Sequence, residues 1–452
     1  MKTKKRRVEY ISFYNHTGLE DHFTKMAKKG WLIESISNFY WTYRRIEPKD
    51  LHFCVTYYPR ASDFDPAPSE EQQTFHDFCA HTGWQHTCTW HQMQVFYNEK
   101  ENPVPLETDP VMEVETLHKA CKKSFLPSYF LLLALGLLMG GYFVARIFAD
   151  PIGLLSDPSH LMTGTAYVCM AIISIRELLS YFLWYARAKR AAQNGIFVDT
   201  PSTAAFQKVI DVIVIAAFAA WVVNILLSGN ILLNWIVLLM LGYMVAVFAI
   251  VNGIKQGLKK LKASRDLNKA LTLIACFILP FIMTALIVNT TLSATRSGVL
   301  EAASNKETIP LSLADLIEID ENKYLAESRL KQTVLLSQRV VYQRPGFDSS
   351  VPSEMPDLGY TVTIVKMPFL YRLCKNQYFS TSTAGCNGTY VIEYLAADAS
   401  PWGAEEVYRQ LDEFGGEKNS YLICYADRFI LIHFDWEPSA EQMAIVAQKL
   451  NP

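Results

Sequence analysis

Five apolar stretches in the middle of this 452-residue chain constrain its fold more than any other feature. A helix needs about 20 mostly apolar residues to cross the hydrocarbon core of a bilayer. Each stretch is about that long, and the third and fourth are too apolar for a helical hairpin of a soluble protein. The sequence therefore predicts a bundle of five transmembrane helices. We place the spans at residues 125–148, 161–185, 207–227, 231–251 and 270–289.

Lysine and arginine residues lie in alternate gaps between these stretches. The gaps before the first, third and fifth spans are basic, whereas the gap after the first span and the turn between the third and fourth contain neither residue type. Short cytoplasmic loops carry the excess of positive charge. The pattern predicts a multi-pass plasma-membrane protein with a cytoplasmic N-terminus and an extracytoplasmic C-terminus, and Arg146 is the one residue against it. We expect no cleavable signal peptide, because a polar stretch follows the basic N-terminus.

Residues 1–110 are rich in aromatic residues and contain one pattern twice: strand, helix, Gly-Trp, strand, strand. Gly30 and Gly83 would end the two helices, since glycine accepts the left-handed conformation that closes a helix. Trp31 and Trp84 would fill the space under the helices. The two copies should form one antiparallel sheet with helices on one face, in a cytoplasmic α+β domain. The expected strands are 8–14, 32–36, 39–45, 51–58, 85–90 and 92–97, and the expected helices are 19–29 and 70–81.

The stretch MAKKGWLIESISNFYWTYRRIEPKD, followed by a second Gly-Trp segment and then by membrane spans, resembles the bacterial family of domain of unknown function 2812. The resemblance covers roughly residues 8–110. It implies an N-terminal domain followed by transmembrane helices in a bacterial plasma membrane. It implies no activity, because the family has none assigned.

A run of histidines and cysteines in this domain has the residue types that bind zinc. Their spacing argues against a site, because there is no C-x-x-C or H-x₃-H pair and successive residues diverge on a helix or alternate on a strand. We therefore predict no metal site and expect surface histidines on an aromatic-rich strand. The residues are His76, Cys79, His81, His86, Cys88 and His91.

Basic residues flank the cytoplasmic domain, at Lys4–Arg7 and in the juxtamembrane segment 111–124, which contains Lys119, Lys122 and Lys123. We expect both groups to contact anionic lipid of the inner leaflet rather than nucleic acid. No nucleotide-binding, zinc-protease or serine-hydrolase motif occurs in a suitable context. The sequence therefore predicts no catalytic or cofactor-binding residue.

Three ionisable residues lie within the predicted spans: Arg176, Glu177 and Asp211. Charges at this depth are costly and usually face partners or water. An Arg176–Asp211 pair between neighbouring helices is one interpretation, either as a structural clamp or as a proton-linked gate. The other is a second span that sits higher, so that Arg176 and Glu177 approach the cytosolic interface. Gly136 and Gly140 form a small-residue face on the first span, suited to packing within one bundle or to a homo-oligomer.

After a linker at 291–310, residues 311–452 are expected to form an extracytoplasmic α+β domain. We expect short helices at 313–316 and 324–330, strands at 333–343 and 359–367, a helix at 402–414, a hairpin at 420–434 and a last helix capped by Ser439. Cys374 and Cys386 either form a disulfide or stay as buried thiols. His433, Asp435, Glu437 and Glu393 form no recognisable catalytic set.

The placement of these parts predicts a non-enzymatic membrane protein that couples a cytoplasmic to an extracytoplasmic domain, as a sensor, regulator or envelope accessory protein. Its partners would be the bilayer and an unidentified protein that binds the cytoplasmic domain. The alternative is a small transporter or export component that uses Arg176, Glu177 and Asp211.

Overall fold

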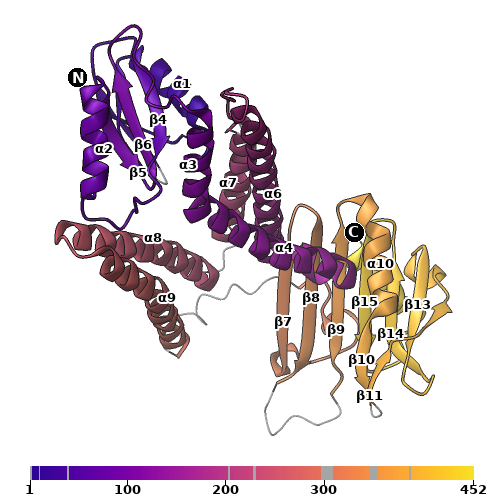
Figure 1. Cartoon of the computed structure of the whole chain (residues 1–452). Coiled ribbons are helices and arrows are strands. Elements are labelled where there is room, and N and C mark those ends of the chain that lie inside the picture. Colours follow the sequence, from indigo (N-terminus) through magenta and orange to yellow (C-terminus); the bar gives the residue numbers. More distant parts are fainter. Residues whose placement is uncertain are drawn as a thin grey trace. The chain divides into compact units, whose positions relative to one another are not determined.

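The computed structural model describes residues 3–9, 11–37, 40–201, 204–227, 231–296, 309–346, 355–385 and 388–451. The chain divides into two units, and the helices at residues 125–149 and 158–192 contribute to both. Figure 1 shows the helices and strands of the chain. The first unit comprises Met1–Leu138 and Tyr167–Ser304, and the second comprises Met139–Ala166 and Asn305–Pro452. Each unit therefore joins segments that are distant in the sequence.

Two three-stranded antiparallel sheets form the N-terminal head, residues 4–98 of the first unit. The first sheet has the order β1-β3-β2 and the second the order β4-β6-β5, so the two copies of the repeat have the same topology. A helix connects the first strand of each copy to the second. The elements are β1 (Lys4–Arg7), α1 (His16–Ala27), β2 (Trp31–Ile36), β3 (Trp41–Arg45), β4 (His52–Tyr57), α2 (Glu70–His81), β5 (Gln85–Trp90) and β6 (Met93–Asn98).

The edge strands β2 and β5 are irregular at equivalent positions. The register shifts between Ile33 and Ser35 in β2 and between His86 and Cys88 in β5. Such a bulge interrupts the ladder of backbone hydrogen bonds. The two strands lie beside each other, and the Thr87 hydroxyl donates a hydrogen bond to the carbonyl of Ile33. The expectation of one continuous sheet is therefore wrong, because the bulged edges keep the two sheets separate.

The Gly-Trp pairs end the helices in both copies but differ in burial. Gly30 has φ +75° and Gly83 has φ +94°. Trp84 is buried, and its Nε1 donates a hydrogen bond to the carbonyl of Val104 at 2.8 Å. Trp31 is only partly buried, and the side chains of Lys5 and Arg45 cover its ring.

The first strand begins and ends earlier than expected. β1 ends at Arg7, so the strand predicted at 8–14 is wrong. β1 is an edge strand made of basic residues. Its sequence therefore lacks the alternation of apolar and polar residues that would identify a strand. Phe13 and Tyr14 instead turn into the core, and the side chain of Asn15 caps α1 by accepting a hydrogen bond from the Gly18 amide at 3.0 Å.

Four helices are long and apolar enough to cross a membrane: Phe125–Ala149 (α4), Pro158–Ala192 (α6), Asn234–Lys260 within α8 (Ile231–Lys260) and Arg265–Ser293 within α9 (Arg265–Arg296). At most 28% of the apolar window of any of them is buried by the protein, so most of this apolar surface needs a lipid environment. The third predicted span is also a helix, α7 (Ala204–Leu227), with the same mean hydropathy as α4, but it is not among the four. A fifth crossing, made by α7, stays a prediction.

A seven-stranded antiparallel sheet forms the core of the second unit, in the order β12-β13-β14-β15-β9-β8-β7. Ile430 and Ile432 lie in one core with α11 (Ala440–Leu450), whereas Phe429 lies in another with α10 (Tyr371–Ser380) and α5 (Pro151–Ser156). Because side chains alternate along a strand, the two cores lie on opposite faces of the sheet. The strands are β7 (Tyr324–Gln332), β8 (Leu336–Pro345), β9 (Leu358–Val365), β12 (Tyr394–Ala397), β13 (Glu406–Leu411), β14 (Glu417–Cys424) and β15 (Arg428–Phe434), and β10 (Ser382–Gly385) and β11 (Gly388–Val391) form a separate hairpin.

Two helices predicted in this part of the sequence are wrong. The 324–330 segment belongs to strand β7, and residues 406–411 of the 402–414 segment form strand β13. Each pairs with the strand that follows it, β7 with β8 and β13 with β14, and this pairing overrides a local helical pattern. The hairpin of β14 and β15 is confirmed, as is the last helix, where Ser439 and Gln442 form the predicted capping box.

Candidate functional site at the head and the helix ends

Glu177 is buried beside the core of the head. It is 2% exposed, and its Oε2 accepts a hydrogen bond from the Ser12 hydroxyl at 2.7 Å. The next turns of α6 place Tyr181 and Trp184 in that core, beside Tyr14. The last turns of α6 therefore pack on the head, while the whole helix, Pro158–Ala192, is a candidate span that includes the predicted residues 161–185.

The expected pair of Arg176 with Asp211 does not form. Among the described residues, no ion pair joins these two side chains. The guanidinium of Arg176 lies over the ring of Phe206, with 3.9 Å between the Cζ atom and the ring centroid. Asp211 has one carboxylate oxygen buried without a hydrogen-bond partner in the described part of the chain. The three ionisable residues are thus not brought together.

Helix α3 (Pro110–Lys123) extends the head over the segment that was expected to be only a basic juxtamembrane region. Val114, Leu117 and Ala120 are buried in the head core, while the lysines are on other faces. His118 Nδ1 and the Tyr181 hydroxyl are 2.5 Å apart, and the His118 ring stacks on Tyr185 at 4.1 Å. Helix α3 therefore fixes the last turns of α6 on the head.

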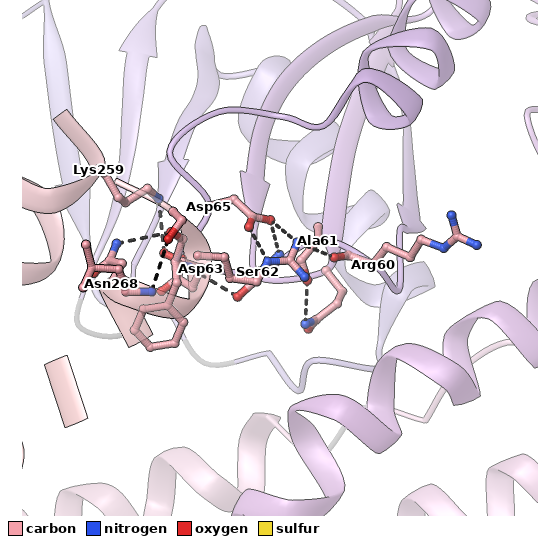
Figure 2. Close-up of polar contacts among 12 residues, drawn as sticks. Arg60, Ala61, Ser62, Asp63, Asp65, Lys259 and Asn268 are labelled. Atoms are coloured by element: carbon pink, nitrogen blue, oxygen red, sulfur yellow. Dashed lines mark hydrogen bonds and ion pairs between the residues drawn. The ribbon is translucent and has the colours of Figure 1, made fainter. Parts of the chain in front are cut away.

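A second contact joins the head to the connection between α8 and α9, and Figure 2 shows its polar network. In the loop after β4, Asp63 pairs with Lys255 of α8, and its backbone carbonyl accepts a hydrogen bond from Lys259 at 3.3 Å. Arg265 at the start of α9 forms a bidentate pair with Asp65, at 2.5 Å and 2.8 Å. Burial alone would raise the pKa of the Asp63 carboxyl, but His91 and Lys255 lower it below its usual value.

A carboxylate-rich pocket of about 330 Å³ lies between α1, α3 and the segment after α6. His16 Nε2 is 2.7 Å from Glu113, and the Val55 amide donates a hydrogen bond to Glu20 at 2.8 Å. Burial raises the pKa of Glu20 to about 7 and also raises the pKa of Glu107. Nothing in the sequence pattern indicated this cluster, because its members come from four separate segments.

The histidine and cysteine run of the head comes together only in part, where the rings of His76 and His86 stack with 4.2 Å between their centroids. Cys79 and Cys88 are buried in two different apolar clusters. His76 approaches Gln94 at 3.0 Å and His86 approaches Thr89 at 2.9 Å, so each ring has its own polar neighbour. These contacts agree with the interpretation of an aromatic-rich strand with histidines near the surface.

In the second unit, the connection between α4 and α6 docks on the C-terminal sheet domain. Gln377 of α10 donates a hydrogen bond to Asp150 at 2.8 Å and accepts one from the Ile152 amide at 2.9 Å. Thr333 donates a hydrogen bond to the Leu155 carbonyl at 2.6 Å, and Lys331 pairs with Asp157. Cys374 is a buried thiol in this domain; Cys386 lies outside the described residues, so their predicted disulfide is not tested.

The four candidate spans, the two-sheet head and the separate sheet domain are features of a multi-pass membrane protein. Residues 15–129 match the model of a family described as protein of unknown function (DUF2812), and this part of the chain is therefore a domain of that family. The match runs from the start of α1 through α3 into α4, so the family domain includes the helix that fixes α6. No curated protein and no solved structure matches the chain.

Proposed function

We propose that this chain is a non-enzymatic plasma-membrane protein that couples a cytoplasmic head to an extracytoplasmic C-terminal domain, as a sensor, regulator or envelope accessory protein. The observation that carries the proposal is that α4 and α6 are each packed at both ends. Phe125 of α4 and Trp184 of α6 are buried in the head core, whereas Ile147 of α4 and Leu161 of α6 pack against the core that α5 and α10 share with the sheet. A displacement at one end of a continuous helix therefore reaches the other end.

The loop contacts support five crossings. The connection at 150–157 contacts the C-terminal domain, whereas Thr200, Lys255 and Arg265 contact the head. A loop that contacts a domain must lie on the same side of the membrane as that domain. The connection before α7 and the connection after α8 both contact the head, so both lie on the same side of the membrane. If α8 crosses the membrane, α7 must therefore cross it as well. The resulting arrangement has the N-terminus inside and the C-terminus outside, as the basic residues indicate.

The transport alternative would need Arg176, Glu177 and Asp211 along one path. Glu177 is buried against Ser12 and Arg176 lies over Phe206, so no observation on these residues favours a path. Contact with anionic lipid through Lys119, Lys122 and Lys123, and an unidentified protein partner of the head, are further parts of the proposal.

Hydrogen exchange in the full chain tests the coupling. Gln377→Ala removes both side-chain hydrogen bonds that tie α10 to the α4–α6 connection. We expect faster amide exchange not only at residues 150–157 but also at residues 11–18 of the head, where Ser12 contacts α6. Gln448→Ala, the same substitution at an exposed position of α11, is the matched control and should leave the head unchanged. Exchange that rises at 150–157 and stays at the wild-type rate throughout the head would contradict the proposal.

A further inference from the structure

The C-terminal domain contains a cluster of one histidine and two carboxylates that the sequence did not suggest. In the part of the chain that the structure describes, Asp357, His433 and Asp435 form the one set of three such side chains whose ligand atoms all lie within 4.8 Å of one another. The group is accessible to solvent and borders a pocket of about 470 Å³, which Asp357 and His433 line.

Strand register brings these residues together. His433 of β15 is opposite Gly359 of β9, and the last pair of the two strands is Phe434 with Leu358. Asp435 and Asp357 therefore follow and precede that pair, at the same end of an antiparallel ladder. Since side chains alternate, residues 433, 435, 357 and 359 face the same side of the sheet.

A buried hydroxyl orients the histidine. Ser420 of β14 is opposite His433, and its Oγ lies 2.7 Å from His433 Nδ1. When Nδ1 donates to this oxygen, the lone pair of Nε2 is free for a ligand, as in most metal-binding histidines. Ser420 is 5% exposed, and 3.6 Å between His433 Nε2 and Asp435 is too long for a hydrogen bond, so the three do not form a nucleophilic triad.

The two carboxyl groups are held close together, and within the described part of the chain neither forms an ion pair with a lysine or an arginine. The Asp357 amide donates a hydrogen bond to Asp435 Oδ2 at 2.8 Å, which fixes the second carboxylate beside the first. A bound cation would offset the repulsion between two carboxylates at this distance.

We infer that Asp357, His433 and Asp435 bind a divalent transition-metal cation, with water completing its coordination. One imidazole nitrogen and two carboxylate oxygens suit zinc or manganese better than calcium, which prefers oxygen ligands alone. Ligand atoms about 2.0–2.2 Å from zinc are at most about 4.4 Å apart, so small side-chain rotations from the present separations suffice. The inference departs from the absence of a metal site predicted from sequence. It concerns the C-terminal domain by itself and does not depend on the proposed coupling.

Titration calorimetry tests the site with the full chain, purified in detergent without an affinity tag and stripped with a chelator. We expect one saturable zinc site per chain, weaker binding of manganese, and weaker still of calcium. His433→Gln and Asp435→Asn should each lower the zinc affinity at least tenfold, and Ser420→Ala about tenfold through loss of orientation. His160→Gln, an exposed histidine of the same unit, and Glu441→Gln are the matched controls and should bind as the wild type does.

Thermal unfolding without metal shows whether each variant is folded, and zinc should raise the midpoint of the wild type but not that of Asp435→Asn. If His433→Gln fails to fold, Asp357→Asn takes its place in the comparison. The inference is overturned if the wild type shows no saturable binding of zinc or manganese. It is equally overturned if zinc binds the folded Asp435→Asn and Asp357→Asn variants with wild-type affinity.

Discussion

At the scale of single residues, burial decides what the ionisable groups of this chain can do. Glu177 is in an apolar helical sequence, yet its neighbours are Ser12 and the aromatic rings of the head. Its hydrogen bond to Ser12 offsets part of the cost of burying a carboxyl group. In the cluster of His16, Glu20, Glu107 and Glu113, burial raises the pKa of Glu20 and of Glu107, whereas burial lowers the pKa of His16 and the neighbouring Glu113 raises it above its usual value.

Glu20 should make the head less stable as the pH rises from 5 to 8, whereas the lowered pKa values of His22, His86, His91 and His118 act in the opposite direction. The pKa of Glu20 is about 7 in the folded chain and lies above its usual value, so between these values the folded state holds a proton that the unfolded state has lost. The raised pKa values of Glu107 and His16 act in the same direction. One pKa unit is about 1.4 kcal/mol, which makes the loss from Glu20 on the order of 3 kcal/mol.

Thermal unfolding of the full chain in detergent at pH 5, 6, 7 and 8 measures this effect. Glu20→Gln keeps an oxygen for the Val55 amide but cannot titrate, so we expect its midpoint to fall less, or to rise more, between pH 5 and pH 8 than that of the wild type. Glu115→Gln, at an exposed surface pair with Lys119, should keep the wild-type slope. Equal slopes in Glu20→Gln and the wild type would contradict the assignment.

At the scale of elements, each copy of the head repeat reproduces a topology, a helix-ending glycine and a bulge. The bulges separate the two sheets, and the glycines let the chain turn from a helix directly into an edge strand. The packing of α4 against α6 also depends on a single glycine. Gly136 of α4 approaches Ala171 of α6 so closely that a Cβ atom there would lie 2.8 Å from the Ala171 nitrogen.

Alanine at three left-handed glycines should destabilise the first unit unequally. Each substitution costs about 1–2 kcal/mol in backbone strain. At Gly30 the new Cβ would also lie 2.9 Å from the Ile46 carbonyl oxygen, whereas at Gly83 it meets only flexible side chains and at Gly195 it meets nothing within 4 Å. Gly30→Ala should therefore lower the unfolding midpoint most and Gly195→Ala least. A Gly195→Ala loss as large as that of Gly30→Ala would show that backbone contact is not the cause.

At the scale of the whole molecule, the proposed two-sided arrangement depends on how many helices cross the bilayer. Four helices are candidate spans, and we propose α7 as the fifth from its composition and from the loop contacts. An even number of crossings would place both soluble domains on one side and would remove the reason for a coupling role.

Labelling with a membrane-impermeant maleimide shows whether the number of membrane crossings is odd or even. His160→Cys, in the first turn of α6, should react in intact cells. Ser264→Cys, between α8 and α9, should react only after permeabilisation, and a C-terminal protease-sensitive tag should be cleaved in intact cells. The wild-type chain measures the background labelling of its native cysteines. The arrangement is wrong if both new cysteines react alike in intact cells, or if the tag is cut only after permeabilisation.

The order of the elements was largely readable from the sequence, because it depends on properties of contiguous residues. Apolar length indicated the helices, Gly-Trp spacing indicated the repeat, and the Ser439–Gln442 pair indicated the last helix. The segments 324–330 and 402–414 were misread as helices, since pairing with the strand that follows each of them, and not their own residue pattern, decides their conformation.

The candidate sites depend on residues that are far apart in the sequence. The spacing of His433 and Asp435 places them on one face of a strand, but only the register with β9 adds Asp357. The depth of Glu177 was uncertain because hydropathy does not say where a helix leaves the membrane and enters a protein core. The sequence by itself determined which segments need lipid and which side each basic loop prefers, since both follow from composition. Tertiary structure decided which polar groups meet, since strand register and helix packing bring distant residues within bonding distance.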